Sequence, residues 1–233
     1  MNGKNTVKHL HFDSLPSTQT YAKQRRMDGE NLVVTATSQT GGMGTKGRSF
    51  SSQTGGVYLS KLTFYEDLSV KNAFQIMIGA AVAVCETLRF YGLKPLIKWP
   101  NDIWVNDKKI CGILIENTLS GDKVRFSVVG IGLNVSNELP NELKELATTM
   151  ALSMDNPPTV EEVTRRLVAE LEKERSIEEY RGYIGYMGCE ATLILGNERV
   201  PGRLISVDEQ GGLRVEIDGT ERRLTAAEVS VRI

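Results

Sequence analysis

The pattern of hydrophobic and polar positions predicts strands and helices in mixed order along the first part of the chain. Residues 32–36 and 57–64 are rich in β-branched and aromatic side chains, which favours a strand in each segment. From residue 70 to residue 91 apolar side chains recur around most of a helical circumference, and Gly92 follows as a C-terminal cap. A helix that is apolar nearly all round is typical of one buried between a sheet and other elements.

Short strands joined by tight turns are predicted next, over residues 97–99, 103–105, 109–116 and 124–130. Thr159 and Glu162 then form a capping box, so a helix is predicted to begin there and to continue to about Arg181. The apolar residues that would face inward along this helix are Val163, Leu167, Leu171 and Ile177.

The character of the sequence changes after Gly188. Five short strands are predicted over residues 189–195, 199–207, 213–217, 222–224 and 229–232, with no helix between them. Such a run predicts a small β-barrel appended to an α/β domain. We place the boundary near residue 187, which gives domains 1–186 and 187–233.

Composition restricts the class of protein. The 233 residues are 40% hydrophobic and 24% charged, which excludes a disordered chain, and a formal charge of −1 provides no basic field for nucleic acid or an anionic membrane. The longest strongly apolar stretch, residues 76–85, has about half the length of a bilayer-spanning helix, and the N-terminus lacks the apolar core of a secretion signal. Three widely spaced cysteines argue against a disulfide framework. We expect a soluble, cytoplasmic protein.

Histidine and metal chemistry have few candidates. His9 and His11 are the only two histidines, and at alternate positions they would share one face of a short strand as surface or packing residues. The sequence has no His-Glu-x-x-His zinc motif and no Gly-x-Ser-x-Gly elbow. No metal ligand is assigned.

A long loop with six glycines, residues 38–56, is the first segment with distinctive chemistry. Its letters Gly42-Met43-Gly44-Thr45-Lys46-Gly47 satisfy G-x-G-x-x-G, but no helix follows, so a dinucleotide site is not predicted, and no P-loop frame is present. Closely spaced glycines let backbone N–H groups converge on an anion, to which Lys46 and Arg48 would add positive charge. A flexible hairpin loop with a polar tip is the alternative.

Two lysines flank apolar strand residues in the segment LIKWPNDIWVNDKKICGILIEN. Lys98 and Lys109 would be costly beside a buried strand unless an anion compensates their charge. Gly112 removes a side chain from the strand, as happens where a ligand lies against the backbone. The local carboxylates that could pair with the lysines are Asp102, Asp107 and Glu116. Lysines that keep an edge hairpin soluble are the alternative interpretation.

Taken together, four blocks of sequence resemble the biotin–protein ligases, which biotinylate the carrier domain of carboxylases. The blocks are Ser17-Thr18-Gln19-Thr20, residues 39–50, KWPNDIWVNDKKICGILIEN and VVGIGLNV, in the family's order. The resemblance implies an α+β fold, in which a mixed β-sheet is flanked by helices and followed by a small C-terminal SH3-like β-barrel. Because sixteen residues precede Ser17, the DNA-binding winged helix of repressor-type relatives is not expected.

The resemblance also implies roles for individual residues. Those toward biotin are Ser17, Thr18, Gln19, Gln39, Met43, Gly44, Thr45, Lys109, Gly112 and Gly132. Those toward the nucleotide are Lys46, Arg48, Phe50, Lys98, Asn101 and Asn134. Catalytic roles fall to Lys109, Arg48 and Asp102. The loop departs from the family pattern, because Met43 and Thr45 replace groups that hold carboxylate or adenylate, and Phe50 stands where the family often has Trp.

The implied reaction joins biotin to ATP with Mg²⁺, giving biotinyl-5'-AMP and pyrophosphate, and then transfers biotin to a lysine of a biotin carboxyl carrier protein. No DNA or membrane partner is expected, and a homodimer is an assembly found among related ligases. Two alternatives stay open. One is a ligase or acyltransferase of the same broad fold that acts on lipoate or octanoate, and the other is a biotin-binding module without catalytic activity.

Overall fold

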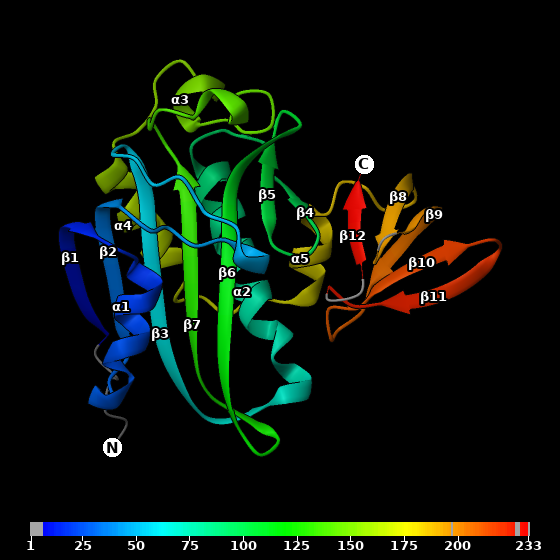
Figure 1. The fold of residues 1–233 in the computed structure, drawn as a ribbon, viewed down its shortest axis with the longest axis horizontal. Helices are drawn as coiled ribbons and strands as arrows, with labels where there is room; N and C mark the ends of the chain where they lie inside the picture. Colours follow the sequence, from blue (N-terminus) through cyan, green and yellow to red (C-terminus); the bar gives the residue numbers. More distant parts are fainter. Residues whose placement is uncertain (1–6, 197, 227–228, 233) are drawn as a thin grey trace.

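The computed structural model describes residues 7–196, 198–226 and 229–232, and its centre is a seven-stranded sheet (Figure 1). The strands stand in the order β1-β2-β3-β7-β6-β5-β4. Their bounds are Lys8–Leu15 (β1), Leu32–Gln39 (β2), Gly56–Ser69 (β3), Leu96–Lys98 (β4), Asp102–Val105 (β5), Lys108–Ser120 (β6) and Lys123–Asn134 (β7). β1 and β2 pair in parallel, and the other described pairs are antiparallel. This mixed sheet flanked by helices confirms the predicted α+β fold.

The parallel pairing of β1 with β2 requires a connection that returns along the sheet. Helix α1 (Thr18–Gln24) and the 3₁₀ helix η1 (Arg25–Asp28) make this connection. α1 begins at Ser17, whose hydroxyl accepts a hydrogen bond from the Thr20 amide at 3.3 Å. Hydrophobic periodicity does not predict α1, because the helix has only 7 residues.

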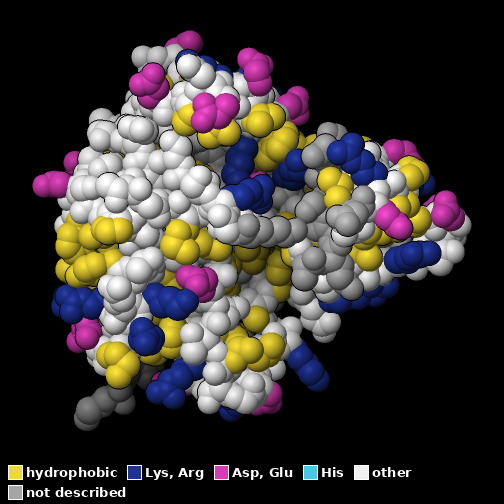
Figure 2. Space-filling model, in the orientation of Figure 1, with side chains coloured by type: hydrophobic (Ala, Val, Ile, Leu, Met, Phe, Trp, Pro, Cys, Tyr) yellow, Lys and Arg dark blue, Asp and Glu magenta, His cyan; other side chains and the backbone are white. Residues whose placement is uncertain are grey.

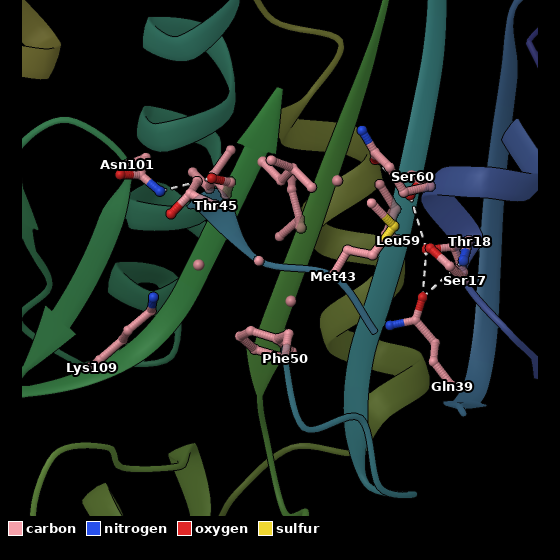
Figure 3. A pocket seen from close by; sticks show the side chains of 18 residues that line it. Ser17, Thr18, Gln39, Met43, Thr45, Phe50, Leu59, Ser60, Asn101 and Lys109 are labelled. Atoms are coloured by element: carbon pink, nitrogen blue, oxygen red, sulfur yellow. Dashed lines mark hydrogen bonds between the residues drawn. The ribbon is translucent and has the colours of Figure 1, made fainter. Parts of the chain in front are cut away.

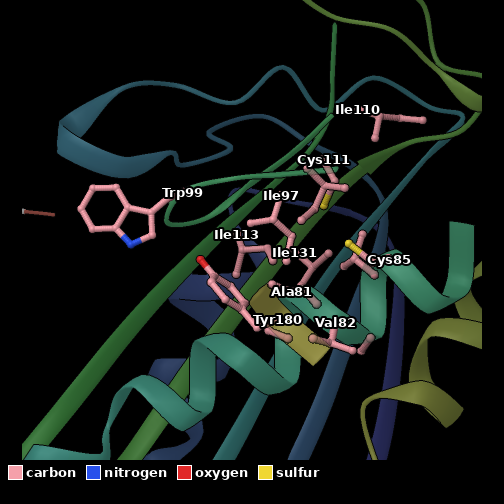
Figure 4. Packing of buried hydrophobic residues seen from close by; sticks show 14 of the residues in the cluster. Ala81, Val82, Cys85, Ile97, Trp99, Ile110, Cys111, Ile113, Ile131 and Tyr180 are labelled. Carbon is pink, nitrogen blue, oxygen red and sulfur yellow. The ribbon is translucent and has the colours of Figure 1, made fainter. Parts of the chain in front are cut away.

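Helix α2 (Phe74–Phe90) is the central helix of the opposite face, and it confirms the helix predicted between residues 70 and 91. The 3₁₀ helix η3 (Val70–Asn72) precedes it, and Gly92 follows with φ of 86°. By length and composition, Val70–Phe90 would suffice to cross a membrane, but 56% of its apolar window is buried inside the protein. Figure 4 shows Ala81, Val82 and Cys85 of α2 facing the strands. Packing against the sheet therefore accounts for the apolar character of this helix.

The two faces of the sheet carry cores of different size. Alternate residues of β2 divide between them, since Val33 belongs to the α2 face while Leu32 and Val34 belong to the α1 face. The α2 side holds the main core, which continues into the second sheet. The core on the α1 side is a small cluster of Ala22, Leu32, Val34, Leu62, Phe126 and Val128. Much of the α1 face beyond that cluster is consequently free for a pocket.

The single helix predicted from Thr159 to about Arg181 is wrong. The structure has two helices, α4 (Val160–Glu170) and α5 (Ile177–Tyr183), and both pack against α2. A second capping box causes the break, because Ser176 has an extended backbone and its hydroxyl accepts from the Glu179 amide. The remaining short helices are η2 (Thr45–Gly47), η4 (Asn141–Leu143) and α3 (Met150–Ser153).

The C-terminal segment forms a second sheet of five antiparallel strands, in the order β11-β10-β9-β8-β12 (Figure 1). The strands are β8 (Glu190–Leu195), β9 (Glu198–Val207), β10 (Leu213–Ile217), β11 (Thr220–Leu224) and β12 (Val229–Arg232). They confirm the predicted strands and agree with a small SH3-like domain. The division of the chain near residue 187 stays a prediction.

The second sheet is attached to the first through the turn that follows β4. The Trp99 indole N–H donates to the Gly211 carbonyl at 3.1 Å in a buried hydrogen bond. Arg181 of α5 donates to the Val207 carbonyl at 2.7 Å, and Tyr180 donates to the Pro100 carbonyl at 2.8 Å. These contacts fix the position of the turn that immediately precedes Asp102.

We expect Trp99→Phe to lower the free energy of unfolding by about 1–3 kcal/mol, because it leaves the buried Gly211 carbonyl without its donor. Trp104→Phe is a matched control, since the Trp104 indole N–H has no hydrogen-bond partner among the described residues. Urea unfolding followed by circular dichroism measures both variants. Equal losses of stability would contradict the structural role of the Trp99 bond.

Candidate active site

A pocket lies over the α1 face of the sheet, beneath the glycine-rich loop (Figure 3). The end of β2, the N-terminus of α1 and the loop form one wall, strands β3, β7 and β6 form the floor, and Asn101 and Lys109 stand at the far end. It brings together these predicted residues: Ser17, Thr18, Gln19, Gln39, Met43, Gly44, Thr45, Phe50, Asn101, Lys109, Gly112 and Gly132. It adds Leu59, Ser60, Ile113, Leu114, Gly130 and Ile131, which were not predicted.

Three glycines leave the floor of the pocket without side chains. Gly112 of β6 pairs with Gly132 of β7, and Gly130 lies two residues earlier on β7. A Cβ atom on Gly132 would lie 2.5 Å from the Phe50 ring, and one on Gly130 would lie 2.5 Å from Gln19 Oε1. The floor therefore requires glycine because other side chains lie directly against the backbone.

Lys109 reaches the floor because β6 contains a bulge. The register of β5 and β6 passes from Ile103↔Cys111 to Trp104↔Lys109, so Ile110 is the extra residue. In a regular strand Lys109 and Gly112 would lie on opposite faces, since side chains alternate. Here Lys109 Nζ lies 3.1 Å from the position of a Cβ on Gly112. The bulge thus brings a cation to the face of the glycine floor.

An ion pair holds the Lys109 side chain. Its Nζ lies 2.7 Å from Asp102 Oδ1, and the two side chains are 32% and 26% exposed. Asp102 itself pairs with Gly112 in the register of β5 and β6. The neighbouring Lys108 donates instead to the Lys144 carbonyl at 2.9 Å, outside the pocket. The predicted catalytic pair of Lys109 and Asp102 is therefore in contact.

The glycine-rich loop forms a small hairpin over the floor. The Gly44 amide donates to the Arg48 carbonyl at 2.7 Å, and the Phe50 amide donates to the Gly42 carbonyl at 2.9 Å. At its tip, Arg48 Nη2 donates to Thr45 Oγ1 at 3.0 Å, and Nε donates to the Thr45 carbonyl at 3.2 Å. The Arg48 side chain is thus folded onto Thr45 and does not line the pocket.

The wall opposite Lys109 is neutral and rich in hydrogen-bonding groups. Gln39 Oε1 accepts from the Thr18 amide at 2.8 Å and lies within hydrogen-bond distance of Thr18 Oγ1, at 3.1 Å. Gln39 Nε2 donates to Ser52 Oγ at 2.8 Å, and Ser52 in turn donates to the Phe50 carbonyl at 3.0 Å. These bonds connect the start of α1, the end of β2 and the loop, and Figure 3 shows the contact between Thr18 and Gln39.

The other predicted residues lie around the pocket or outside it. Asn101 Nδ2 donates to the Ile113 carbonyl at 2.9 Å, and Asn134 Nδ2 donates to the Thr148 carbonyl at 3.1 Å. Asn134 therefore ties the end of β7 to a neighbouring loop and does not line the pocket. Lys98 lies across the hairpin from Asp102, with Nζ 4.2 Å from the centre of the Trp104 ring. The side chain of Lys46 lies outside the described part of the chain.

The electrostatics of the pocket favour binding of an anion over nucleophilic catalysis by the protein. Burial raises the pKa of the Cys111 thiol, so this neighbour of Gly112 stays protonated at neutral pH. On the same face of the molecule, Lys and Arg side chains gather below the segment that carries α3 (Figure 2). Lysine charge beside backbone amides suits a carboxylate or a phosphate.

Comparison with known proteins decides the family. Residues 11–134 match the model of the biotin/lipoate A/B protein ligase family. This chain belongs to that family. The ligase is 30% identical to the bifunctional ligase/repressor BirA of Bacillus subtilis, over 95% of this chain and 73% of that protein. It is 28% identical to the biotin–[acetyl-CoA-carboxylase] ligase of Mycobacterium tuberculosis, over 87% of this chain and 79% of that one.

A solved structure shows the same fold. The biotin protein ligase from Aquifex aeolicus in complex with biotin and ATP superposes with a TM-score of 0.75 and is 29% identical. The match covers 97% of this ligase and 98% of that chain. The likeness therefore extends beyond the family model, which ends at Asn134, to the second sheet of the ligase.

We expect Gly132→Ala to destabilise the ligase by about 1–3 kcal/mol, because the new methyl group would overlap the Phe50 ring. The cost should largely disappear in a Phe50→Ala background, in which that ring is absent. A double-mutant cycle measured by urea unfolding gives the coupling between the two positions. Additive effects would show that Phe50 does not lie on the glycine floor.

Proposed function

We propose that this ligase activates biotin with ATP and transfers it to a lysine of a carrier protein. The observation that carries the proposal is a glycine floor with an ion-paired lysine at one end and a wall of neutral hydrogen-bonding groups at the other. A molecule with a carboxylate at one end and a polar ring at the other matches this arrangement. The bound biotin and ATP of the Aquifex relative support the choice.

The neutral wall favours biotin over lipoate. The cyclic urea of biotin can hydrogen-bond with Thr18 and Gln39, whereas the dithiolane ring of lipoate has no strong donor or acceptor. A lipoate ring would leave the remaining lone pairs of the Thr18 and Gln39 oxygens unpaired, and a site built for hydrogen bonds discriminates strongly against such a ligand. We therefore assign biotin as the acid, and a ligase of the same fold acting on lipoate or octanoate is the second candidate.

The first chemical step brings two anions together. A carboxylate oxygen of biotin attacks the α-phosphorus of ATP, the bond to the β-phosphate oxygen breaks, and biotinyl-5'-AMP and pyrophosphate form. Lys109 would neutralise charge between the carboxylate and the phosphate, and the backbone amides of the loop would add further donors. Lys98, on the strand paired with that of Asp102, and Arg48, at the tip of the loop, are the cations that would serve the remaining phosphates after their side chains reorient.

In the second step, the amine of the carrier lysine attacks the carbonyl carbon of the mixed anhydride and AMP leaves. The lysine must first lose a proton, because an ammonium is not a nucleophile. Asp102 is the carboxylate beside the pocket that could accept this proton or orient the amine. In the structure Asp102 also holds Lys109, so it would serve both steps.

A magnesium ion fits this site only if the nucleotide supplies most of its ligands. Among the described residues, no group of three or more His, Cys, Asp or Glu side chains could hold a metal ion. Mg²⁺ commonly keeps several waters and binds phosphates with one or two carboxylates, of which Asp102 is the one beside the pocket. When bound, the ion would offset negative charge on the phosphates.

The Phe50 ring occupies part of the floor on which a ligand would lie. The Phe50 ring lies against Gly112 and Gly132, where an extended acid would rest. We propose that withdrawal of Phe50 opens the floor and that the loop then closes over the bound acid.

We expect the purified ligase to catalyse ATP–pyrophosphate exchange with biotin and not with lipoate. Lys109→Ala should slow this exchange about 100- to 1000-fold, as loss of a group that stabilises developing charge does. Lys108→Ala is the matched control, because its side chain lies outside the pocket. Biotin binding without exchange would favour a binding module, and normal exchange in Lys109→Ala would remove Lys109 from the mechanism.

We expect Asp102→Asn to slow transfer from pre-formed biotinyl-5'-AMP to a carrier protein by about 100-fold or more, the usual effect of losing a general base. Asp107→Asn makes the same chemical change in the exposed turn of the same hairpin and should leave transfer unaffected. Single-turnover transfer of labelled biotin measures both variants. Equal rates in the two variants would show that Asp102 does not act on the incoming amine.

A further inference from the structure

The orientation of one buried amide, that of Gln19, is fixed by groups behind the pocket. Gln19 is only 3% exposed, and its Nε2 donates to Glu116 Oε2 at 3.1 Å and to the Val128 carbonyl at 3.0 Å. Both partners are acceptors, so a flipped amide would place its oxygen against two oxygens. Gln19 Oε1 must therefore face Ser60.

Ser60 transmits this orientation to Thr18. Its buried hydroxyl lies 3.2 Å from Gln19 Oε1 and 2.9 Å from Thr18 Oγ1. A hydroxyl has a single proton to donate, and Gln19 Oε1 can only accept. If Ser60 donates to Gln19, Thr18 must donate to Ser60. The single Thr18 proton has two acceptors within reach, Gln39 Oε1 at 3.1 Å and Ser60 Oγ at 2.9 Å, and donation by Ser60 to Gln19 selects the shorter contact to Ser60.

The result is a wall that accepts hydrogen bonds. Gln39 Oε1 still accepts a hydrogen bond from the Thr18 backbone amide at 2.8 Å, and its second lone pair is available to a ligand. With the Thr18 proton committed to Ser60, the Thr18 oxygen also has lone-pair capacity available to a ligand. The wall would thus receive N–H donors from a bound ring.

Glu116 is the charged end of the row of hydrogen bonds that runs through Gln19 and Ser60 to Thr18. Lys23 lies 2.7 Å from Glu116 Oε1, and Glu116 is outside the lining of the pocket. Partial burial acts to raise the pKa of the Glu116 carboxyl, but hydrogen bonds from Lys23 and Gln19 and the Lys23 charge outweigh it, so the pKa lies below its ordinary value. As an ionised carboxylate, Glu116 can only accept, and together with the Val128 carbonyl it holds the Gln19 amide in one orientation.

We propose that Glu116 is a positioning residue that sets the direction of hydrogen bonding in the pocket wall through Gln19 and Ser60, so that the wall accepts N–H groups from the ligand ring. The inference rests on the proposed function, because biotin carries two such N–H groups in its cyclic urea. It assigns to Glu116 an effect on ring recognition, without contact between Glu116 and the ligand.

Glu116→Gln tests the inference with little change in shape. A neutral amide at this position can donate to Gln19, so one of the two acceptors that hold the Gln19 amide is removed and only the Val128 carbonyl still opposes a flip. The flipped amide, and with it the reversed direction of the hydroxyl hydrogen bonds, then becomes populated. We expect the KM for biotin to rise about tenfold, the cost of one unsatisfied buried hydrogen bond, with the KM for ATP unchanged. Lys23→Gln is the matched control. It removes the charged partner and keeps the carboxylate, and exposed ion pairs contribute little, so less than about a threefold change is expected.

Two further readouts separate positioning from general structural damage. The wild type should prefer biotin to an analogue methylated at a ureido nitrogen, and Glu116→Gln should lose much of this preference. Ser60→Ala removes the hydroxyl that connects Gln19 with Thr18, so adding Glu116→Gln to this variant should raise the KM for biotin no further. Circular dichroism and thermal melting confirm that each variant is folded.

The outcomes are distinct. Equal biotin KM values and equal analogue preference in Glu116→Gln and Lys23→Gln would overturn the inference, as would additive effects of Glu116→Gln and Ser60→Ala. Failure of the wild type to bind biotin or to exchange pyrophosphate would instead overturn the proposed function. A biotin KM that rises in Glu116→Gln alone, with loss of analogue preference, supports the assigned role.

Discussion

The bare backbone at the centre of the sheet is the constraint on which the rest of the site depends. Three glycines, at positions 112, 130 and 132, place no side chains on this face, so the core there is confined to a small cluster beside α1. The protein compensates on the other face, where α2, α4 and α5 cover the sheet and the main core continues into the second sheet. Stability and chemistry are therefore placed on opposite sides of the same strands.

The groups around the floor are held by elements whose own positions come from that main core. Tyr180 and Trp99 belong to the main core. The Tyr180 hydroxyl donates to the Pro100 carbonyl in the turn before Asp102, and the indole of Trp99, which lies in that turn, donates to the Gly211 carbonyl between β9 and β10. The ion pair with Asp102 then fixes the Lys109 side chain. Packing on the α2 face is thus transmitted through a short turn to the charged end of the pocket.

Much of the fold could be predicted from the sequence, because period-two patterns, turn residues and the apolar α2 segment are local signals. The break between α4 and α5 also had a local signal in Ser176 and Glu179, which form the same capping pattern as Thr159 and Glu162. No local signal indicated that Lys109 and Gly112 share a face. In a regular strand, residues three apart lie on opposite faces, and only the pairing register reveals the bulge. Ser60 and Gly130 likewise enter the pocket through neighbouring strands, while Asn134 points to a loop that its position in the sequence does not reveal.

If the Phe50 ring must leave the glycine floor before the acid binds, as we propose, the apparent affinity of the ligase has two components. One is the intrinsic free energy of binding to a molecule whose floor is uncovered, and the other is the free energy needed to withdraw the ring. A ligand that binds only the uncovered form has an apparent dissociation constant equal to the intrinsic one divided by the population of that form. Affinity for the acid can therefore change through the resting equilibrium of one aromatic side chain, while every contact to the ligand stays the same.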